Sequence, residues 1–514
     1  MTKQYLVTAE EMKYYDGYTI NSLGILSQVL MERAALKVVE VISDKYLQGI
    51  DPSGEKILVV AGGGNNGGDG LAVARLLYDK GCKVDVFLLG KREHLSKETA
   101  LQLNILEKYG LALESNFPEK EYDIIVDALF GIGLNREVEG LYRETIQKIN
   151  SSSAKKVAVD VPSGIDTDTG NVYGAAVQAD VTVTFAYAKR GLFFYPGAEY
   201  AGEVICKDIG ITKLSTVGKE PEMYTLTGEV TAMLPKRRAD GNKGSFGKVF
   251  LVAGSDQMAG AAVLCGKAMF RSGAGMVKIC TCESNRIILQ ETLPEAMLLT
   301  FEDTKEQPEG LFREKFLNSL EWADCIVAGP GMGTGHVAER MLKWIIEESD
   351  LPLLLDADAL NLLAQNVILH EKLLLSIEQK GRSVVLTPHA GELARLLHCS
   401  IKEIKAQPVK MARTAAAKYQ AVVVSKDART LVCGSRTAIF MNTAGNSGMA
   451  TAGSGDVLSG VIGAMLATGE SAQECAVLGT YLHARAGDMA AQIKGEAGVM
   501  ASDIIEAVAA LQKG

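Results

Sequence analysis

Two series of short, β-branched apolar runs, separated from one another by helix-length segments, constrain the fold of this chain more than any other feature. The first series comprises Lys56–Ala61, Lys83–Leu89, Tyr122–Ala128, Lys156–Val161 and Val181–Phe185. The second comprises Lys248–Ala253, Cys325–Ala328, Leu351–Leu355, Ser383–Leu386 and Ala421–Ser425. Such alternation is typical of parallel strands covered by helices on both faces. The sequence therefore predicts an α/β fold built from three-layer sandwiches.

The length of the chain and one polar interruption predict two domains. Its 514 residues exceed the roughly 250 to 300 residues over which a single hydrophobic core grows. Residues 211–222 lose the strand pattern and are polar with Gly and Pro, which is typical of a domain boundary. We predict domains at residues 1–215 and 225–514. Because Leu23, Leu26 and Leu30 recur at spacings of three and four, we expect the chain to open with a helix.

Composition narrows the class of protein. With 47% hydrophobic and 22% charged residues the chain is neither disordered nor fibrous, and its formal net charge of −9 disfavours a nucleic-acid partner. No signal-type start and no apolar run of the roughly 18 residues that a membrane span needs is present. Nine scattered cysteines without zinc-site spacing favour a reducing setting. We expect a cytoplasmic protein without membrane contact and, by analogy between α/β folds, a homo-oligomer.

The segment GGGNNGGDG follows the first strand directly. Gly62, Gly64 and Gly67 have the G-x-G-x-x-G spacing of dinucleotide-binding loops, in which glycines let backbone N–H groups approach a pyrophosphate. We expect a phosphate-binding loop followed by a helix from about Leu71; the alternative is a tight turn without a ligand. The polar side chains at positions 65, 66 and 69 are not required for phosphate binding, so the loop is expected to recognise a further group.

Three motifs in order, NNGGDG, DALFGIG at residues 127–133 and AVDVPSGI at residues 158–165, resemble the NAD(P)H-hydrate epimerase family. The resemblance covers residues 1–215 and implies a Rossmann-like fold. It implies substrate contacts from Asn65, Asn66, Gly67, Gly68, Asp69, Gly131, Ile132, Gly133, Leu134, Asn135, Arg136, Glu137 and Asp160. It also implies a potassium ion at Asn66, Asp127 and Ser163, whose oxygen atoms suit a hard cation.

Asp160 is the candidate acid/base residue of this first domain. Epimerisation at the hydrated carbon C6 requires that the hydroxyl leaves or the ring opens, followed by addition from the other face, and a carboxylate at a strand's carboxyl end suits this chemistry. The alternatives are a solvated or helix-capping carboxylate for Asp160, and a cap of the turn at residues 130–133 for Asp127.

In the second domain, NTAGNSGMATAGSGDVLSGVIGAMLA at residues 442–467 places Gly453, Gly455 and Asp456 at the start of an apolar helix. Free N–H groups and the helix dipole hold phosphoryl oxygens there, while Asp456 takes a proton from an attacking hydroxyl. The segment resembles the anion hole and base of a ribokinase-type kinase. The alternative is that Asp456 is a helix N-cap. No Walker-type phosphate loop occurs in this domain.

Further motifs resemble the ADP- or ATP-dependent NAD(P)H-hydrate dehydratase family over residues 225–510. They are KGSFGKVFLVAGS (243–255), GAGMVK (273–278), GPGMG (329–333), DADALN (356–361) and LTPHAGELARLL (386–397). The resemblance implies a ribokinase-like fold and ADP, or ATP, with magnesium as co-substrate. It implies substrate contacts at Ala262, Gly333, His389 and Asp456, and nucleotide contacts at Lys426, Asp427, Ala428, Arg429, Thr430 and Gly455.

Lys426 and His389 have plainer alternatives, and the directions of two further residues, Asp356 and Asp358, stay open. Lys426 can be a solvated surface lysine, and His389, alone in a loop, can be structural. Asp356 and Asp358, one residue apart after a strand, point to opposite faces if the strand continues and into one site if it turns, so neither is named as catalytic.

Together the two resemblances imply an enzyme that repairs hydrated NAD(P)H. One domain would interconvert the R and S hydrates, and the other would dehydrate the S hydrate with conversion of ADP to AMP. Two rival hypotheses stay open: a ribokinase-like kinase of a small alcohol, and an N-terminal half that binds a nucleotide without catalysis.

Overall fold

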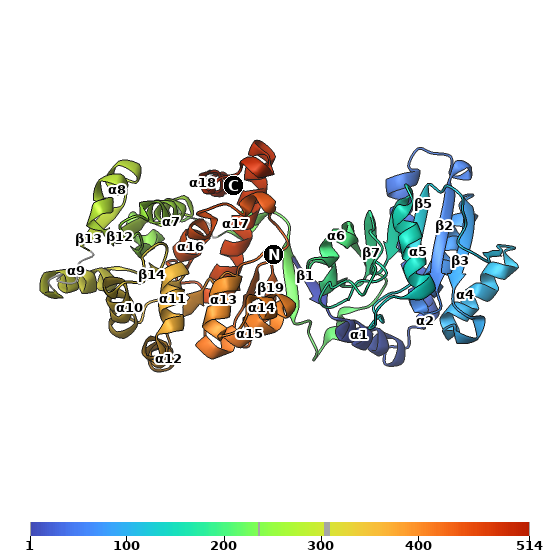
Figure 1. The fold of residues 1–514 in the computed structure, drawn as a ribbon, viewed down its shortest axis with the longest axis horizontal. Helices are drawn as coiled ribbons and strands as arrows, with labels where there is room; N and C mark the ends of the chain where they lie inside the picture. The colour runs from blue at the N-terminus through green and yellow to red at the C-terminus, as the bar shows by residue number, and fades with distance from the viewer. Residues whose placement is uncertain (1, 235–236, 303–308, 513–514) are drawn as a thin grey trace. The chain divides into compact units, whose positions relative to one another are not determined.

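The computed structural model describes residues 2–234, 237–302 and 309–512. The chain divides into two compact units, Gln4–Met223 and Tyr224–Gly514, the second including the N-terminal residues up to Lys3. The division falls directly after the polar stretch 211–222. The N-terminal unit runs from blue to green in the ribbon, and the C-terminal unit from green to red (Figure 1).

The N-terminal unit is built on seven parallel strands in the order β4-β3-β2-β5-β6-β7-β9. They are β2 (Lys56–Gly62), β3 (Lys83–Leu89), β4 (Leu113–Glu114), β5 (Ile124–Ala128), β6 (Lys155–Val159), β7 (Val181–Phe185) and β9 (Glu203–Lys207). All five strands predicted in this half are present, two of them with the predicted bounds.

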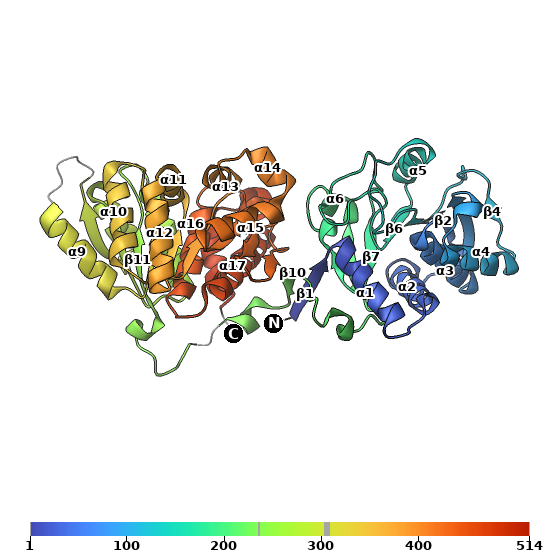
Figure 2. The ribbon, with the colours of Figure 1, turned by 90° about the horizontal axis from the view of Figure 1, so that it is seen from below.

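Helices cover both faces of this sheet. They are α2 (Ser27–Ile42), α3 (Asn65–Asp79) and α4 (Lys97–Lys108) on one face and α5 (Gly140–Ser151) on the other (Figure 2). In β2, Ile57 and Val59 belong to the core beneath α2 and α3, whereas Leu58 and Val60 belong to the core beneath α5. Because successive strand residues face opposite sides, an almost continuous apolar run fills both cores. The predicted Rossmann-like three-layer sandwich is confirmed.

The expectation that the chain opens with a helix is wrong. A strand comes first, β1 (Thr2–Val7), followed by α1 (Ala9–Asn21), and Leu23 and Leu26 precede α2. The strand forms because Leu6 and Val7 pair in parallel with β8 (Ala188–Lys189) and become fully buried. A partner so distant in sequence leaves no local pattern.

The Gly-rich segment also differs from its prediction, because α3 begins at Asn65 rather than near Leu71. A Cβ atom on Gly67 would lie 1.8 Å from the carbonyl oxygen of Gly62, and a Cβ on Gly62 would lie 2.0 Å from that of Leu129. These two glycines therefore let the helix N-terminus approach the sheet closely. Tertiary packing overrides the low helix propensity of glycine here.

Gly67→Ala is expected to lower the free energy of unfolding of the N-terminal unit by about 3 kcal/mol, since a methyl group overlapping a backbone carbonyl forces the helix outward. Gly64→Ala is the matched control, because a Cβ there meets nothing within 4 Å and only the N-cap preference is lost, at about 0.5 kcal/mol. Urea unfolding of both variants checks this. Equal losses would contradict the packing role of Gly67.

The C-terminal unit contains a sheet with the order β13-β12-β11-β14-β15-β16-β17-β18-β19-β10. The strands from β13 to β17 are parallel, and β17, β18 and β19 are antiparallel. Their bounds are β10 (Met223–Thr227), β11 (Lys248–Val252), β12 (Met276–Cys282), β13 (Met297–Phe301), β14 (Cys325–Ala328), β15 (Leu353–Leu355), β16 (Val384–Leu386), β17 (Val422–Ser425), β18 (Leu431–Cys433) and β19 (Ile439–Met441). The five predicted strands are again present.

Helices pack on both faces of this sheet too. The long helices are α7 (Ala259–Arg271), α9 (Glu309–Trp322), α10 (His336–Glu348), α11 (Ala357–Gln365), α12 (Val367–Lys380), α13 (Ala390–Leu397), α15 (Pro408–Tyr419), α16 (Ser454–Leu466), α17 (Ala472–Lys494) and α18 (Ala501–Ala510). Phe250 of β11 stacks against Phe316 of α9, while its neighbour Leu251 faces Gly266 of α7. This is the second predicted three-layer α/β sandwich. Of the helices described, none is long and apolar enough to cross a membrane.

Candidate active sites in the two units

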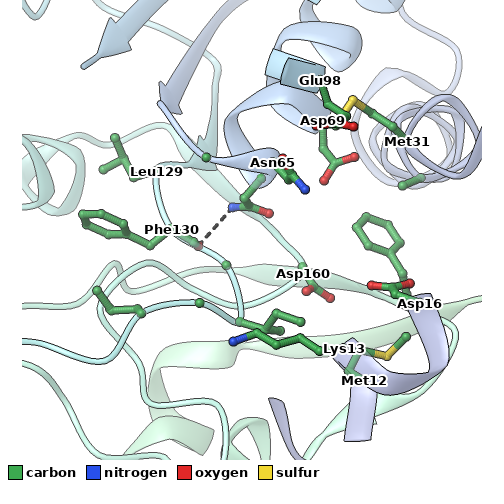
Figure 3. A pocket seen from close by; sticks show the side chains of 18 of the residues that line it. Met12, Lys13, Asp16, Met31, Asn65, Asp69, Glu98, Leu129, Phe130 and Asp160 are labelled. Atoms are coloured by element: carbon green, nitrogen blue, oxygen red, sulfur yellow. Dashed lines mark hydrogen bonds between the residues drawn. The ribbon is translucent and has the colours of Figure 1, made fainter. Parts of the chain in front are cut away.

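The N-terminal unit has a cavity of about 710 Å³ at the carboxyl ends of β2, β5 and β6 (Figure 3). Most of the predicted substrate residues line it: Asn65, Asn66, Asp69, Gly131, Ile132, Gly133, Leu134, Asn135, Arg136 and Asp160. Gly67, Gly68 and Glu137 do not. A Cβ on Gly68 would meet Met31 at 2.7 Å, so both glycines serve helix packing.

Asp160 is held by two side chains that the sequence did not indicate. Lys189 Nζ lies 2.5 Å from Asp160 Oδ1, and the Thr184 hydroxyl donates to the same oxygen at 3.0 Å. The Lys189 side chain is only 1% exposed. Asp160 has φ +67°, a left-handed conformation that is uncommon outside glycine and concentrates at functional sites. Asp160 is therefore an ion-paired carboxylate at the cavity wall rather than a solvated or helix-capping one.

The three residues predicted to bind potassium form one cluster, in which Asn66 and Ser163 contact the backbone of Phe130 and Asp127 contacts Ser163. The fully buried carboxylate of Asp127 accepts hydrogen bonds from Ser163 N at 2.8 Å and Ser163 Oγ at 2.6 Å, and from Leu129 N at 3.3 Å. Asn66 Nδ2 donates to Phe130 O at 3.0 Å. Burial raises the pKa of Asp127 to about 6, against the hydrogen bonds from Ser163 and Leu129, which lower it.

The oxygen atoms of Asn66, Asp127, Ser163 and the neighbouring backbone fit a potassium ion. They are carboxylate, hydroxyl, amide and carbonyl oxygens, the ligands that hard cations prefer. Across the described residues, Asp127 has no ion pair with a basic side chain. Asp127 also accepts a hydrogen bond from Leu129 N, directly before the turn at residues 130–133 that the plainer alternative has it cap.

In the C-terminal unit, Asp456 lies in the first turn of α16, whose N-cap is Gly453 with φ +86°. A Cβ on Gly453 would meet Leu264 at 2.4 Å, so both conformation and space require glycine. Asp456 is therefore not the N-cap that the alternative proposed. Burial, then the nearby Asp356 carboxylate, raises the pKa of Asp456 to about 6, while Lys426 opposes this. A carboxylate with this pKa suits a general base near neutrality.

Lys426 is not a solvated surface lysine. Its Nζ lies 2.8 Å from Asp356 Oδ1, with side-chain exposures of 19% and 2%. Burial alone lowers the pKa of Lys426, but the charges of Asp356 and Glu392 outweigh it and the pKa lies above its ordinary value. A Cβ on Gly455 would lie 3.4 Å from Lys426 Nζ. The ammonium thus stands beside the N-terminus of α16, where phosphate oxygens would bind.

Asp356 is a site residue that the sequence analysis did not assign. Its other oxygen accepts a hydrogen bond from Ser459 Oγ at 2.8 Å. Asp358 accepts from the N–H of Gly333 at 2.9 Å. Because β15 ends at Leu355, both carboxylates turn towards one site, and their charges act on Asp456. The position after a strand's carboxyl end was the signal available in the sequence.

The remaining residues predicted for the C-terminal site differ in their exposure and in their surroundings. His389 is the N-cap of α13 and accepts from Gly391 N through Nδ1 at 3.0 Å, yet its side chain is 54% exposed. Ala262 is fully buried beneath Gly254. Residues 427–430 form the exposed turn between β17 and β18, closed by the hydroxyl of Thr430 on Asp427 O at 3.1 Å. Lys426 and Gly455 are the nucleotide candidates that lie together.

Comparison with known proteins identifies both halves. The family model for the NAD(P)H-hydrate dehydratase matches residues 249–510, and that for the YjeF-related protein N-terminus matches residues 27–191. The chain resembles a solved structure of the ADP/ATP-dependent NAD(P)H-hydrate dehydratase from Bacillus subtilis, co-crystallised with ATP and Mg²⁺, at 28% identity and a TM-score of 0.48, covering 55% of this chain and 95% of that one.

Full-length relatives contain both halves. The bifunctional NAD(P)H-hydrate repair enzyme Nnr of Moorella thermoacetica is 37% identical over 98% of this chain and 95% of its own length. The enzyme of the same name from Escherichia coli is 34% identical over 96% of this chain and 92% of its own length. The chain belongs to the family of bifunctional NAD(P)H-hydrate repair enzymes.

Proposed function

We propose that the N-terminal domain interconverts the R and S epimers of hydrated NAD(P)H, and that the C-terminal domain dehydrates the S epimer with a nucleotide, preferably ADP. The observation that supports this most directly is the pairing of two separate carboxylate sites in one chain. Asp160 stands at the wall of a cavity large enough for a dinucleotide's reactive end, and Asp456 stands at a helix N-terminus beside Lys426.

In the C-terminal site the chain's own residues prepare a phosphoryl transfer. Asp456 removes the proton of the C6 hydroxyl, whose oxygen attacks the terminal phosphorus of the nucleotide, and AMP leaves when the donor is ADP. Lys426 and the N–H groups at the start of α16 hold the transferring oxygens. Phosphate then departs from C6 while C5 loses a proton, which restores the dihydronicotinamide double bond.

Two cations complete the proposal. Asn66, Asp127 and Ser163 would hold potassium, which supplies positive charge beside the substrate cavity. Magnesium would accompany the nucleotide phosphates. The C-terminal site suits a metal-bound nucleotide, since Asp356, Asp358 and Asp456 outnumber Lys426 there and would repel an uncomplexed polyphosphate.

The test is recovery of NADH absorbance from a mixture of both NADH-hydrate epimers with potassium, magnesium and either ADP or ATP. We expect complete recovery that requires a nucleotide, and faster recovery with ADP. No recovery with either nucleotide would contradict the proposal. Accumulation of a stable phosphorylated product would instead favour the rival kinase of a small alcohol.

A further inference from the structure

The N-terminal cavity contains carboxyl groups besides that of Asp160, which is ion-paired with Lys189. Asp16 of α1 and Asp69 of α3 line it together with Asp160 and Lys189. Figure 3 shows the side chains of Asp16, Asp69 and Asp160 turned into the same space. These three carboxyl groups lie near one buried ammonium group, that of Lys189, which forms its ion pair with Asp160 at 2.5 Å.

The pairing of β1 with β8 and the capping of α1 place Asp16 at the cavity. The N-terminal strand β1 pairs in parallel with β8, with Val7 in register with Lys189. Thr8 then caps α1 through a capping box with Glu11, and Glu11 pairs with Arg190 at 3.2 Å. The segment that orients Lys189 therefore also fixes the helix that presents Asp16, and the two residues are positioned as one unit.

Asp16 and Asp160 differ in their ion pairing, since only Asp160 contacts Lys189 directly. No ion pair joins Asp16 to a cation anywhere in the described part of the chain. Burial, together with the Asp160 carboxylate, raises the pKa of Asp16 to about 6, against the opposing charge of Lys189. For Asp69, burial and then the charges of Asp160 and Asp16 raise the pKa well above its ordinary value. Two carboxyl groups whose surroundings differ in this way are typical of an acid and a base that act as a pair.

We propose that Asp16 is a second catalytic residue of the epimerase, the general acid that protonates the C6 hydroxyl as it leaves, while the ion-paired carboxylate of Asp160 receives the proton of the water that adds back. The inference rests on the proposed epimerase function.

The step balances without a further reactant. The proton of Asp16 moves to the hydroxyl oxygen, the C6–O bond breaks, water departs, and the lone pair of N1 forms a C6=N1 double bond. A water molecule then adds to C6 from the other face. A lone pair of the water oxygen forms the new C6–O bond, and the electron pair of the C6=N1 double bond returns to N1. Asp160 takes a proton from the added water. Exchange with solvent returns the proton from Asp160 to Asp16. Each inversion therefore replaces the C6 oxygen by one from water, whereas opening of the ring between C6 and N1 retains it.

The test uses the full-length protein and the pure R hydrate without nucleotide, with the S hydrate followed by chromatography in water labelled with heavy oxygen. Asp16→Asn is expected to lower the kcat of epimerisation roughly 10²-fold or more with little change in KM, and Asp16→Glu to recover part of it. Asp44→Asn, on an exposed aspartate outside the cavity, is the matched control. Circular dichroism and thermal unfolding of each variant, compared with the wild type, report that the N-terminal unit is folded, and dehydration of the S hydrate reports that the C-terminal unit is intact.

The rate profile against pH distinguishes a proton donor from a structural residue. The other acidic and basic residues that line the cavity with Asp16 are Lys13 on its own helix and, from other elements, Asp69, His94, Glu98, Arg136, Asp160 and Lys189. The wild type should lose activity as pH rises and Asp16 gives up its proton, and Asp16→Asn should lack this alkaline limb. Full activity of Asp16→Asn, or retention of the original oxygen during inversion, would overturn the proposal. Failure of the wild type to epimerise would instead refute the proposed function.

Discussion

Asp456→Asn is expected to lower the kcat of dehydration by about 10²- to 10⁴-fold, because the amide cannot take the proton of the attacking hydroxyl. With a pKa of about 6, Asp456 gains its base form as pH rises through that value. The kcat/KM of the wild type should therefore increase between about pH 5 and pH 7, and this acidic limb should disappear in the variant. Steady-state rates with the S hydrate and ADP measure both effects.

Asp503→Asn is the matched control for this substitution. Asp503 occupies the same third position of helix α18 and caps Met500 N at 2.9 Å, so it has the helix environment of Asp456 without the site. We expect a small loss of stability and unchanged dehydration. An equal loss of activity in both variants would mean that Asp456 acts only through the helix.

Asp160→Asn is expected to lower the kcat of epimerisation by about 10²- to 10⁴-fold and to leave dehydration of the S hydrate intact. The amide keeps a hydrogen-bond acceptor for Lys189 and Thr184, so the cavity wall is retained while the base is lost. Asp180→Asn is the control, since Asp180 precedes the amino end of β7, whereas Asp160 follows the carboxyl end of the neighbouring parallel strand β6, and Asp180 pairs with Lys155 at 3.4 Å. Retained epimerisation in Asp160→Asn would show that Asp160 is not the base of the reaction.

Strands with continuous apolar runs could be predicted from the sequence, whereas strands formed only by pairing could not. β3 and β7 have the predicted bounds because apolar side chains recur along both strands, in both cores for β3 and in the core beneath α2 and α3 for β7. β1 and β8 escaped prediction, since one begins with polar residues and the other has two residues. Their pairing is a long-range contact, and it sets the position of Lys189.

The residues of the candidate sites likewise include some that local motifs indicate and some that only long-range packing brings together. Asp160 and Asp456 stand in motifs at a strand end and a helix start, positions where parallel α/β folds place their ligands. Lys189 and Asp16 meet Asp160 through packing of distant segments that no local spacing indicates, whereas Asp356 directly follows the carboxyl end of β15, a position that the sequence does indicate. The spacing of glycines in the Gly-rich segment predicts a phosphate-binding loop, but two of these glycines are needed for close packing of α3.

The most direct test of the account is the fraction of a mixture of R and S hydrates that each protein returns to NADH with ADP, corrected for spontaneous epimerisation. The wild type should recover the whole mixture, Asp160→Asn only the S fraction, and Asp456→Asn almost none. Mixing the two variants should restore complete recovery, because each supplies one intact site. Rapid complete recovery by Asp160→Asn alone, or none by the mixed variants, would contradict a chain in which two separate sites clear both epimers.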